Sequence, residues 1–265
     1  LPQPSEFLKS SADMEKTSLI PGVRDFYLLL VLPIAAYWIS ASLFHLLDCR
    51  RWFQACKIHS YEAGKQRNKA TLRQVFRQVL AQQAIQVMFA LVSYAEHPAL
   101  DAGSRNVLNP SAAPALHKGV ELTLRFIIAI VIADFWQYAW HRVFHSSRFL
   151  YKYVHSVHHR LYVPYSFGAL YSSLAEAFVV DTIGTTVTFY LSGLPVLPAT
   201  WFATLSIIKS VNDHSGYRFP YNPFDYLSAN TTDFHDVHHQ SWGLKYNYSQ
   251  IYLTIWVSLS HKVLS

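Results

Sequence analysis

FYLLLVLPIAAYWISASLFHLL, residues 26–47, decides the architecture, because this run of apolar residues without Asp, Glu, Lys or Arg is long enough to cross a bilayer as a helix. Pro33 lies inside the run and predicts a kink, which membrane helices tolerate. Residues 1–22 are polar and rich in proline, so we expect them to form an N-terminal tail. The sequence therefore predicts a transmembrane helix that follows a polar lead-in.

Four further apolar segments follow, and they predict additional membrane helices. They cover residues 79–94, 120–140, 170–191 and 194–208. The first of them is short and carries three glutamines, and Ser192-Gly193 predicts a turn between the last two. The fold class predicted is all-α: an integral membrane helical bundle with a histidine-rich di-metal cap on the cytosolic side, forming a single domain over residues 1–265.

The charge pattern indicates a membrane partner rather than a nucleic acid. Charged residues make up 14% of the chain and hydrophobic residues 51%, with a net charge of +6. A basic stretch directly follows the first apolar run, with Arg50, Arg51, Lys57, Lys65, Arg67, Lys69, Arg73 and Arg77. Basic residues beside apolar segments favour an anionic membrane face, and the positive-inside rule places them in the cytosol. Two further crossings then return the chain to the cytosol at His141, and the apolar pair 170–208 brings His214 and His235 to the same side.

Nine of the fourteen histidines fall in four short groups. HRVFH (141–145) spaces two of them at i and i+4, while HSVHH (155–159) and HDVHH (235–239) each space three at i, i+3 and i+4. Positions three and four apart share a face of an α-helix, so each group is expected to present its imidazoles in one direction. Imidazole is a common metal ligand. The predicted metal ligands are His141, His145, His155, His158, His159, His214, His235, His238 and His239.

These ligands are too many for one ion, so the pattern favours two. A zinc protease would need HExxH, but Arg142 occupies the position of the glutamate. A ferritin-type site would need Glu-x-x-His pairs, which the sequence lacks. Two iron ions held by imidazoles fit best, with the task of activating O2 to attack an unactivated C–H bond.

DFWQYAWHRVFH (134–145), HSVHHRLYVPYSFGALY (155–171) and FHDVHHQSWG (234–243) resemble the fatty acid hydroxylase / sterol desaturase superfamily, in particular its sphinganine 4-hydroxylase branch. The resemblance covers nearly the whole chain, with residues 120–250 as the catalytic core. It implies a monooxygenase of the endoplasmic reticulum membrane that uses a di-iron centre, O2 and external electrons. The implied reaction hydroxylates the 4-position of sphinganine or dihydroceramide, giving phytosphingosine-type products. Cytochrome b5 is the implied electron donor, and the nine histidines match the family's iron ligands.

Two alternatives stay open at this point. The same superfamily oxidises sterol methyl groups and desaturates lipids, and a diverged paralogue could be an inactive membrane scaffold. The possibility of an inactive scaffold comes from two positions at which the sequence departs from the sphinganine 4-hydroxylase branch. Ser172-Ser173-Leu174 stands where relatives carry Asn-His-Pro, and Trp256 is followed by Val257 instead of Asp.

Several acidic residues are candidates for a supporting role. Asp134 lies two helical turns before His141, and Asp213 and Asp236 are adjacent to predicted ligands, so each either orients an imidazole or is a polar group of its helix. Glu176 and Asp181 lie within an apolar segment. They are expected to pair with arginines of the basic stretch, or else to contact the amino-diol head of a sphingoid base.

Overall fold

The computed structural model describes residues 18–96 and 115–259, and this part of the chain is almost entirely helical. The long helices are α2 (Asp25–Arg50), α4 (Leu72–Glu96), α6 (Ala115–Ser146) and α10 (Val196–Asp213). A further helix is built from α8 (Leu174–Ala177), the π-helical segment η5 (Phe178–Ile183) and α9 (Gly184–Ser192). The short elements are η1 (Gln54–Cys56), α3 (Tyr61–Arg67), α7 (Arg148–Tyr153), η3 (His155–Arg160), η4 (Ser166–Leu170), α11 (Pro223–Leu227), α12 (Thr232–His239) and α13 (Ile255–Leu259).

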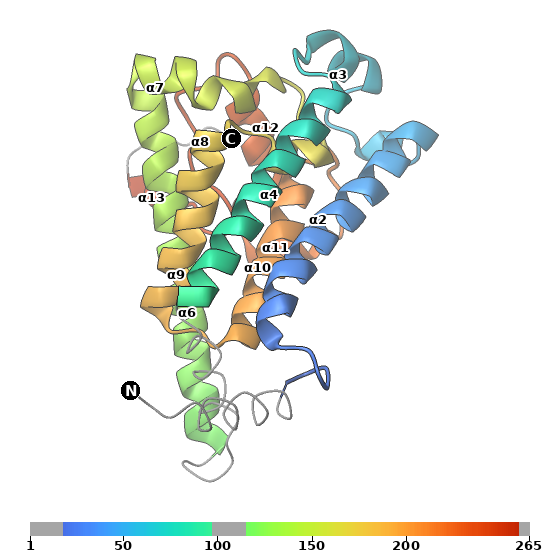
Figure 1. Cartoon of the computed structure of the whole chain (residues 1–265). Helices are drawn as coiled ribbons and strands as arrows, with labels where there is room; N and C mark the ends of the chain where they lie inside the picture. The colour runs from blue at the N-terminus through green and yellow to red at the C-terminus, as the bar shows by residue number, and fades with distance from the viewer. Residues whose placement is uncertain (1–17, 97–114, 260–265) are drawn as a thin grey trace.

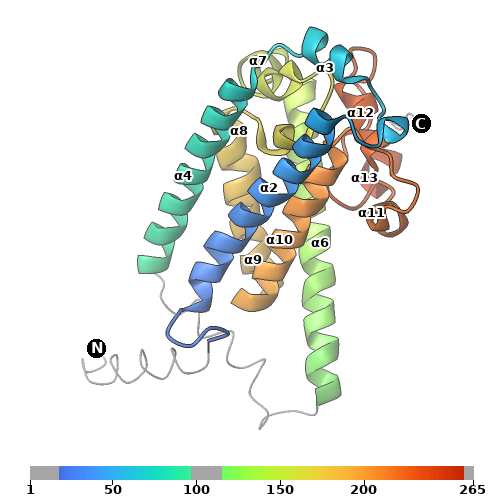
Figure 2. The same ribbon diagram turned by 90° about the vertical axis from the view of Figure 1, so that its right-hand side faces the viewer.

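The long helices form one bundle, and α3, α7, η3 and α12 gather at one end of it (Figures 1 and 2). Helix α10 packs against α2, α6 packs against α9, and α4 contacts α8 and η5. Within the described residues the β-structure is limited to two isolated bridges. The predicted all-α helical bundle with a histidine-rich cap is therefore confirmed, while its orientation toward the cytosol remains a prediction.

Three helices are long and apolar enough to cross a membrane: Asp25–Arg50, Leu72–Ala95 and Leu174–Ser192. Helix α6 contains the predicted span 120–140 and α10 contains most of the span 194–208, and neither is among the three. Helix α10 has 18 residues, and Lys209, Asn212 and Asp213 among them lower its mean hydropathy. The span predicted to begin at residue 170 begins at Leu174 instead, because η4 ends at Leu170 and Ser173 caps the start of α8. Most of the predicted tail 1–22 lies outside the described residues.

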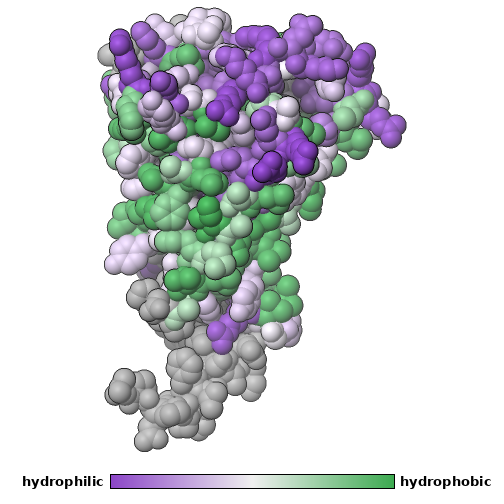
Figure 3. Space-filling view, turned by 45° about the horizontal axis from the view of Figure 1, so that its top comes forward, coloured by the Kyte–Doolittle hydropathy of each residue, from purple (hydrophilic) through white to green (hydrophobic). Residues whose placement is uncertain are grey.

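On the face seen in Figure 3, apolar side chains cover most of the bundle body, and polar ones gather toward the capped end. Ile39 and Leu43 on α2 are 62% and 59% exposed, and Met88 and Val92 on α4 are 62% and 59% exposed. Large apolar side chains that face outward along a whole helix indicate a lipid environment, because water would not favour so large an apolar surface. The bundle body is therefore the membrane portion.

An aromatic cluster fixes the segment that follows HSVHH against the bundle. The hydroxyl of Tyr37, fully buried on α2, donates to the carbonyl of Phe167 at 2.8 Å. The Phe167 ring lies 4.7 Å from that of Phe76 on α4, measured between centroids. This packing holds η4, and with it the backbone of Tyr171 near the histidines.

Helices α6 and α9 approach closely at Gly184. A Cβ atom on Gly184 would lie 2.5 Å from Cδ1 of Trp136, which is far inside van der Waals contact. We therefore expect Gly184→Ala to lower the free energy of unfolding by about 1–3 kcal/mol, as overpacking does. Gly119→Ala on α6 is the matched control, since nothing lies within 4 Å of its Cβ position. Unfolding of both variants in detergent would test this, and equal stability would contradict it.

Candidate metal centre

All nine predicted ligand histidines converge at the capped end of the bundle. They form two groups, and within each group the candidate ligand atoms lie within 4.8 Å of one another. The first group contains His141, His145, His155, His159 and His238. The second group contains His158, His214, His235 and His239. The ring centroids of His159 and His239, one from each group, are 5.0 Å apart, so the two groups are neighbours.

Each HxxHH motif divides its histidines between the two groups. HSVHH gives its i and i+4 residues to the first group and His158 to the second, whereas HDVHH gives His238 to the first and the other two to the second. The imidazoles of each motif all face this site, as predicted, but within it they are shared between the two neighbouring groups. HSVHH is also not α-helical, because it forms the 3-10 segment η3, which is wound more tightly than an α-helix. Each HxxHH motif therefore contributes histidines to both groups, and neither motif builds a group by itself.

Backbone carbonyl groups orient several of the rings. Nδ1 of His158 donates to the carbonyl of Tyr171 at 2.9 Å, and Nδ1 of His238 donates to that of Tyr246 at 2.7 Å. His141 makes the same kind of bond, and the Nε2 atoms of all three rings are buried without a partner among the described residues. A ring that donates through Nδ1 carries a lone pair on Nε2, which is the form that ligates a metal.

The remaining Nε2 atoms crowd together at the spacing of a coordination sphere. Nε2 of His159 lies 3.0 Å from Nε2 of His155, and Nε2 of His235 lies 2.9 Å from Nε2 of His214. Two imidazole nitrogens bound at right angles to an ion at about 2.1 Å would be about 3.0 Å apart. The donor set, its burial and its unpartnered atoms therefore fit two nitrogen-ligated metal ions.

Burial keeps these imidazoles neutral. Desolvation lowers the pKa of His155 and of His238 to about 3, well below the ordinary value of 6.5. Neutral imidazole is the ligating form, so at neutral pH a metal need not displace protons from these rings.

The lowered pKa values predict that the metal-free protein loses stability in acid. Between pH 6.5 and about 3 the unfolded chain binds protons at His155 and His238 that the folded chain does not, so the free energy of unfolding falls as the pH falls. Denaturation of metal-free protein at pH 7.5 and pH 5.5 would show the lower midpoint at pH 5.5. The same midpoint at both values would contradict this expectation.

The three aspartates considered as supporting groups do not hydrogen-bond to a ligand histidine within the described residues, so of the two alternatives the structure favours a role other than orienting an imidazole directly. The carboxylate of Asp134 accepts from the backbone N–H groups of Tyr252 and Leu253, at 3.1 and 2.8 Å. It thereby anchors the segment whose carbonyls hold His238 and His141. Asp236 accepts from Nε2 of His59 at 2.9 Å and ties α12 to the region before α3.

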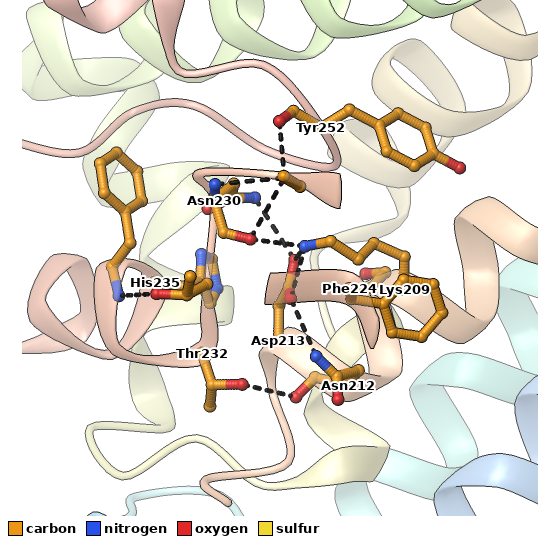
Figure 4. Close-up of polar contacts among 12 residues, drawn as sticks. Lys209, Asn212, Asp213, Phe224, Asn230, Thr232, His235 and Tyr252 are labelled. Carbon is orange, nitrogen blue, oxygen red and sulfur yellow. Dashed lines mark hydrogen bonds and ion pairs between the residues drawn. The ribbon is translucent and has the colours of Figure 1, made fainter. Parts of the chain in front are cut away.

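Asp213 belongs to a buried ionic network between α10 and α12 (Figure 4). Nζ of Lys209 lies 2.7 and 2.6 Å from the two carboxylate oxygens of Asp213 and donates to the carbonyl of Asn230 at 2.6 Å. The hydroxyl of Thr232 donates to the carbonyl of Asn212 at 3.1 Å. These contacts fix the start of α12 to the end of α10, which places His235 against His214.

Among the acidic residues that the structure describes, Glu176 does contact a ligand histidine. Its Oε1 accepts from Nδ1 of His155 at 2.6 Å, and the predicted pairing with arginines of the basic stretch is wrong. Ser173 caps α8 by accepting from the backbone N–H of Glu176. This cap fixes the backbone from which the Glu176 carboxylate reaches His155. In the sequence, Glu176 was noticeable only as an acidic residue within an apolar segment. That position does not predict which residue it contacts.

A cavity of about 40 Å³ lies beside both histidine groups. His141 of the first group and His158 and His214 of the second line it, together with Glu176 and Asp181. A small polar group bound in this cavity would therefore lie next to the candidate metal centre.

Comparison with known proteins agrees with this arrangement. A sphingolipid C4-hydroxylase of Saccharomyces cerevisiae is 36% identical over 256 residues, covering 92% of this chain and 73% of the yeast protein. Sphinganine C4-monooxygenase 2 of Arabidopsis thaliana is 36% identical over 237 residues, 88% of this chain and 86% of the plant protein. A very-long-chain aldehyde decarbonylase of Oryza sativa subsp. indica is 37% identical over 225 residues, 84% of this chain and 83% of the rice protein.

No solved structure shows a significant match to the chain. Residues 126–260, which contain all nine histidines of the candidate centre, match the family model described as Fatty acid hydroxylase. This match and the relatives at 36–37% identity over most of the chain show that the protein belongs to the fatty acid hydroxylase family.

Proposed function

We propose that this protein is a membrane monooxygenase that hydroxylates carbon 4 of sphinganine or dihydroceramide. The observation that carries the proposal is the pair of neighbouring histidine groups at the end of an apolar helical bundle. The names of the yeast and plant relatives support the substrate class. The reaction consumes O2, two electrons and two protons and yields the hydroxylated lipid and water.

Two iron ions bound by the nine histidines would supply the oxidant that attacks an unactivated C–H bond. The chain itself holds the imidazoles in position. Glu176 fixes the tautomer of His155 by accepting from Nδ1, and the carbonyl of Tyr171 does the same for His158. The histidines are buried apart from the partly buried His145, so bulk water is kept from the centre.

The electrons would come from a separate acidic protein, and we propose cytochrome b5. The basic stretch supports this, because α3 lies at the same end of the bundle as α12 (Figure 1), and Arg50, Arg51, Lys65 and Arg67 are exposed there. Opposite charges steer such partners together. The same basic stretch supports a cytosolic orientation of the histidine end, and the lipid substrate class supports the endoplasmic reticulum membrane.

A second function is favoured by the rice relative, whose name assigns it to aldehyde decarbonylation. In that case the substrate would be a long-chain aldehyde and the product a hydrocarbon. A methylsterol monooxygenase of Rattus norvegicus is 34% identical over only 42% of this chain, so a sterol substrate has narrower support.

The test is expression in a cell that lacks its own sphingoid base 4-hydroxylase, followed by lipid analysis. We expect 4-hydroxylated sphingoid bases to form. Hydrocarbons from long-chain aldehydes, without hydroxylated bases, would favour the second function. Normal membrane levels of the protein with neither product would indicate an inactive scaffold and overturn the proposal.

A further inference from the structure

We infer that Asp181 is a specificity-determining residue, whose carboxylate faces the ammonium group of the bound lipid and so selects a cationic head over a neutral one. The inference rests on the proposed hydroxylation and narrows its substrate. A free sphingoid base carries an ammonium group between two hydroxyls. A dihydroceramide carries a neutral amide at the same atom, and a long-chain aldehyde has no cation.

The position of the cavity suits this head group. His141 from one histidine group and His158 and His214 from the other line the same cavity as Asp181. Carbon 4 is bonded to the last carbon of the amino-diol head, so a head that is bound in this cavity brings carbon 4 next to the candidate metal centre. The apolar side chains of Phe144, Leu170 and Val180 also line the cavity and would contact the start of the hydrocarbon chain.

The partners of Asp181 leave its charge uncompensated. Its carboxylate oxygens lie 3.1 Å from Nε2 of Gln82 and 3.5 Å from Nε2 of Gln137, which are neutral amide donors. Within the described residues no lysine or arginine forms an ion pair with it, so the expected pairing with the basic stretch is wrong for Asp181 as well. A carboxylate at membrane depth without a cation is costly, and this cost favours a ligand that supplies the positive charge.

Two further observations point to the same ligand. Asp181 lies in the π-helical segment η5, and π-helical turns inside α-helices occur frequently at functional sites. Oε2 of Glu176, a residue that is 8% exposed and lines the cavity, has no hydrogen-bond partner among the described residues. It is therefore a second free acceptor for an ammonium or hydroxyl group.

The test measures binding of radiolabelled sphinganine to the full chain in phosphatidylcholine nanodiscs, with three competitors. N-methylsphinganine keeps the cation, N-acetylsphinganine removes it at similar bulk, and octadecanal has no amine. We expect N-methylsphinganine to compete about tenfold or more better than either neutral lipid, as a charge-assisted hydrogen bond would provide. Wild-type protein that binds N-acetylsphinganine as tightly would overturn the inference without any variant.

Asp181→Asn provides the residue-level test. We expect it to weaken sphinganine binding by about tenfold or more and to remove the preference for the N-methyl over the N-acetyl compound. Glu62→Gln, which removes an exposed carboxylate on α3, is the control and should change neither. Equal weakening of all ligands would assign Asp181 a structural role and overturn the inference.

The inference and the proposed function can fail separately. Hydroxylation of sphinganine and dihydroceramide without dependence on Asp181 would leave the proposed function intact and overturn the inference. Asp181-dependent binding without a hydroxylated product would refute only the proposed function.

Discussion

Replacing His158 or His238 by alanine is expected to lower the formation of hydroxylated lipid at least about 100-fold. Even the loss of a group that only orients a metal ligand costs about 10–100-fold, and here the ligand itself is removed. His158→Ala leaves three imidazoles in the second group, and His238→Ala leaves four in the first. Because the proposed di-iron centre uses both neighbouring groups, either variant should be sufficient to stop turnover.

His117→Ala is the matched control for these variants. His117 is exposed on α6 and belongs to neither histidine group. We expect its activity to equal that of the unchanged protein, and all three variants should reach the membrane in similar amounts. Full activity of His158→Ala or His238→Ala would show that the assignment of ligands is wrong.

Lys209→Met is expected to lower the free energy of unfolding by about 3–5 kcal/mol, because it leaves the Asp213 carboxylate buried without its cation. Lys209 is 0% exposed, and its Nζ contacts both oxygens of Asp213 and the carbonyl of Asn230. The substitution keeps the length of the side chain, so the loss comes from the charge and its hydrogen bonds. Denaturant titration of detergent-solubilised protein would measure it.

Two controls separate this network from a general effect of losing a lysine. Lys65→Met removes an exposed lysine on α3 and should change stability by less than about 0.5 kcal/mol. The double variant Lys209→Met, Asp213→Leu removes both charges and should recover part of the loss, since an apolar pair can replace a buried ion pair. A Lys209→Met protein as stable as the unchanged chain would contradict the role of the network.

The sequence predicted the bundle and the convergence of the nine histidines because both depend on strong local patterns. The apolar run 26–47 lies inside helix α2, whose bounds are Asp25 and Arg50. The repeated histidine spacing marked eight of the nine residues that converge, and the ninth, His214, directly follows the apolar segment 194–208 and a short polar stretch.

The division of each HxxHH motif between two groups could not be predicted, because it depends on how η3 and α12 face each other across the site. The partner of Glu176 was equally hidden. Glu176 lies 21 residues after His155 in the chain, and the contact between them depends on the serine cap that starts α8. The apolar pattern around Asp181 also does not predict the π-helical segment in which it lies. Charge alone predicted an ion pair with an arginine, whereas Asp181 contacts Gln82 and Gln137.

The metal content of the purified protein tests the central claim most directly. Elemental analysis of protein purified without chelators should give about two metal ions per chain, since the two histidine groups each fit one ion. His158→Ala should reduce this to about one, and His117→Ala should leave it unchanged. One ion or none in active, unchanged protein, or two ions retained in a variant that lacks both His158 and His238, would contradict the account of two neighbouring histidine-bound ions.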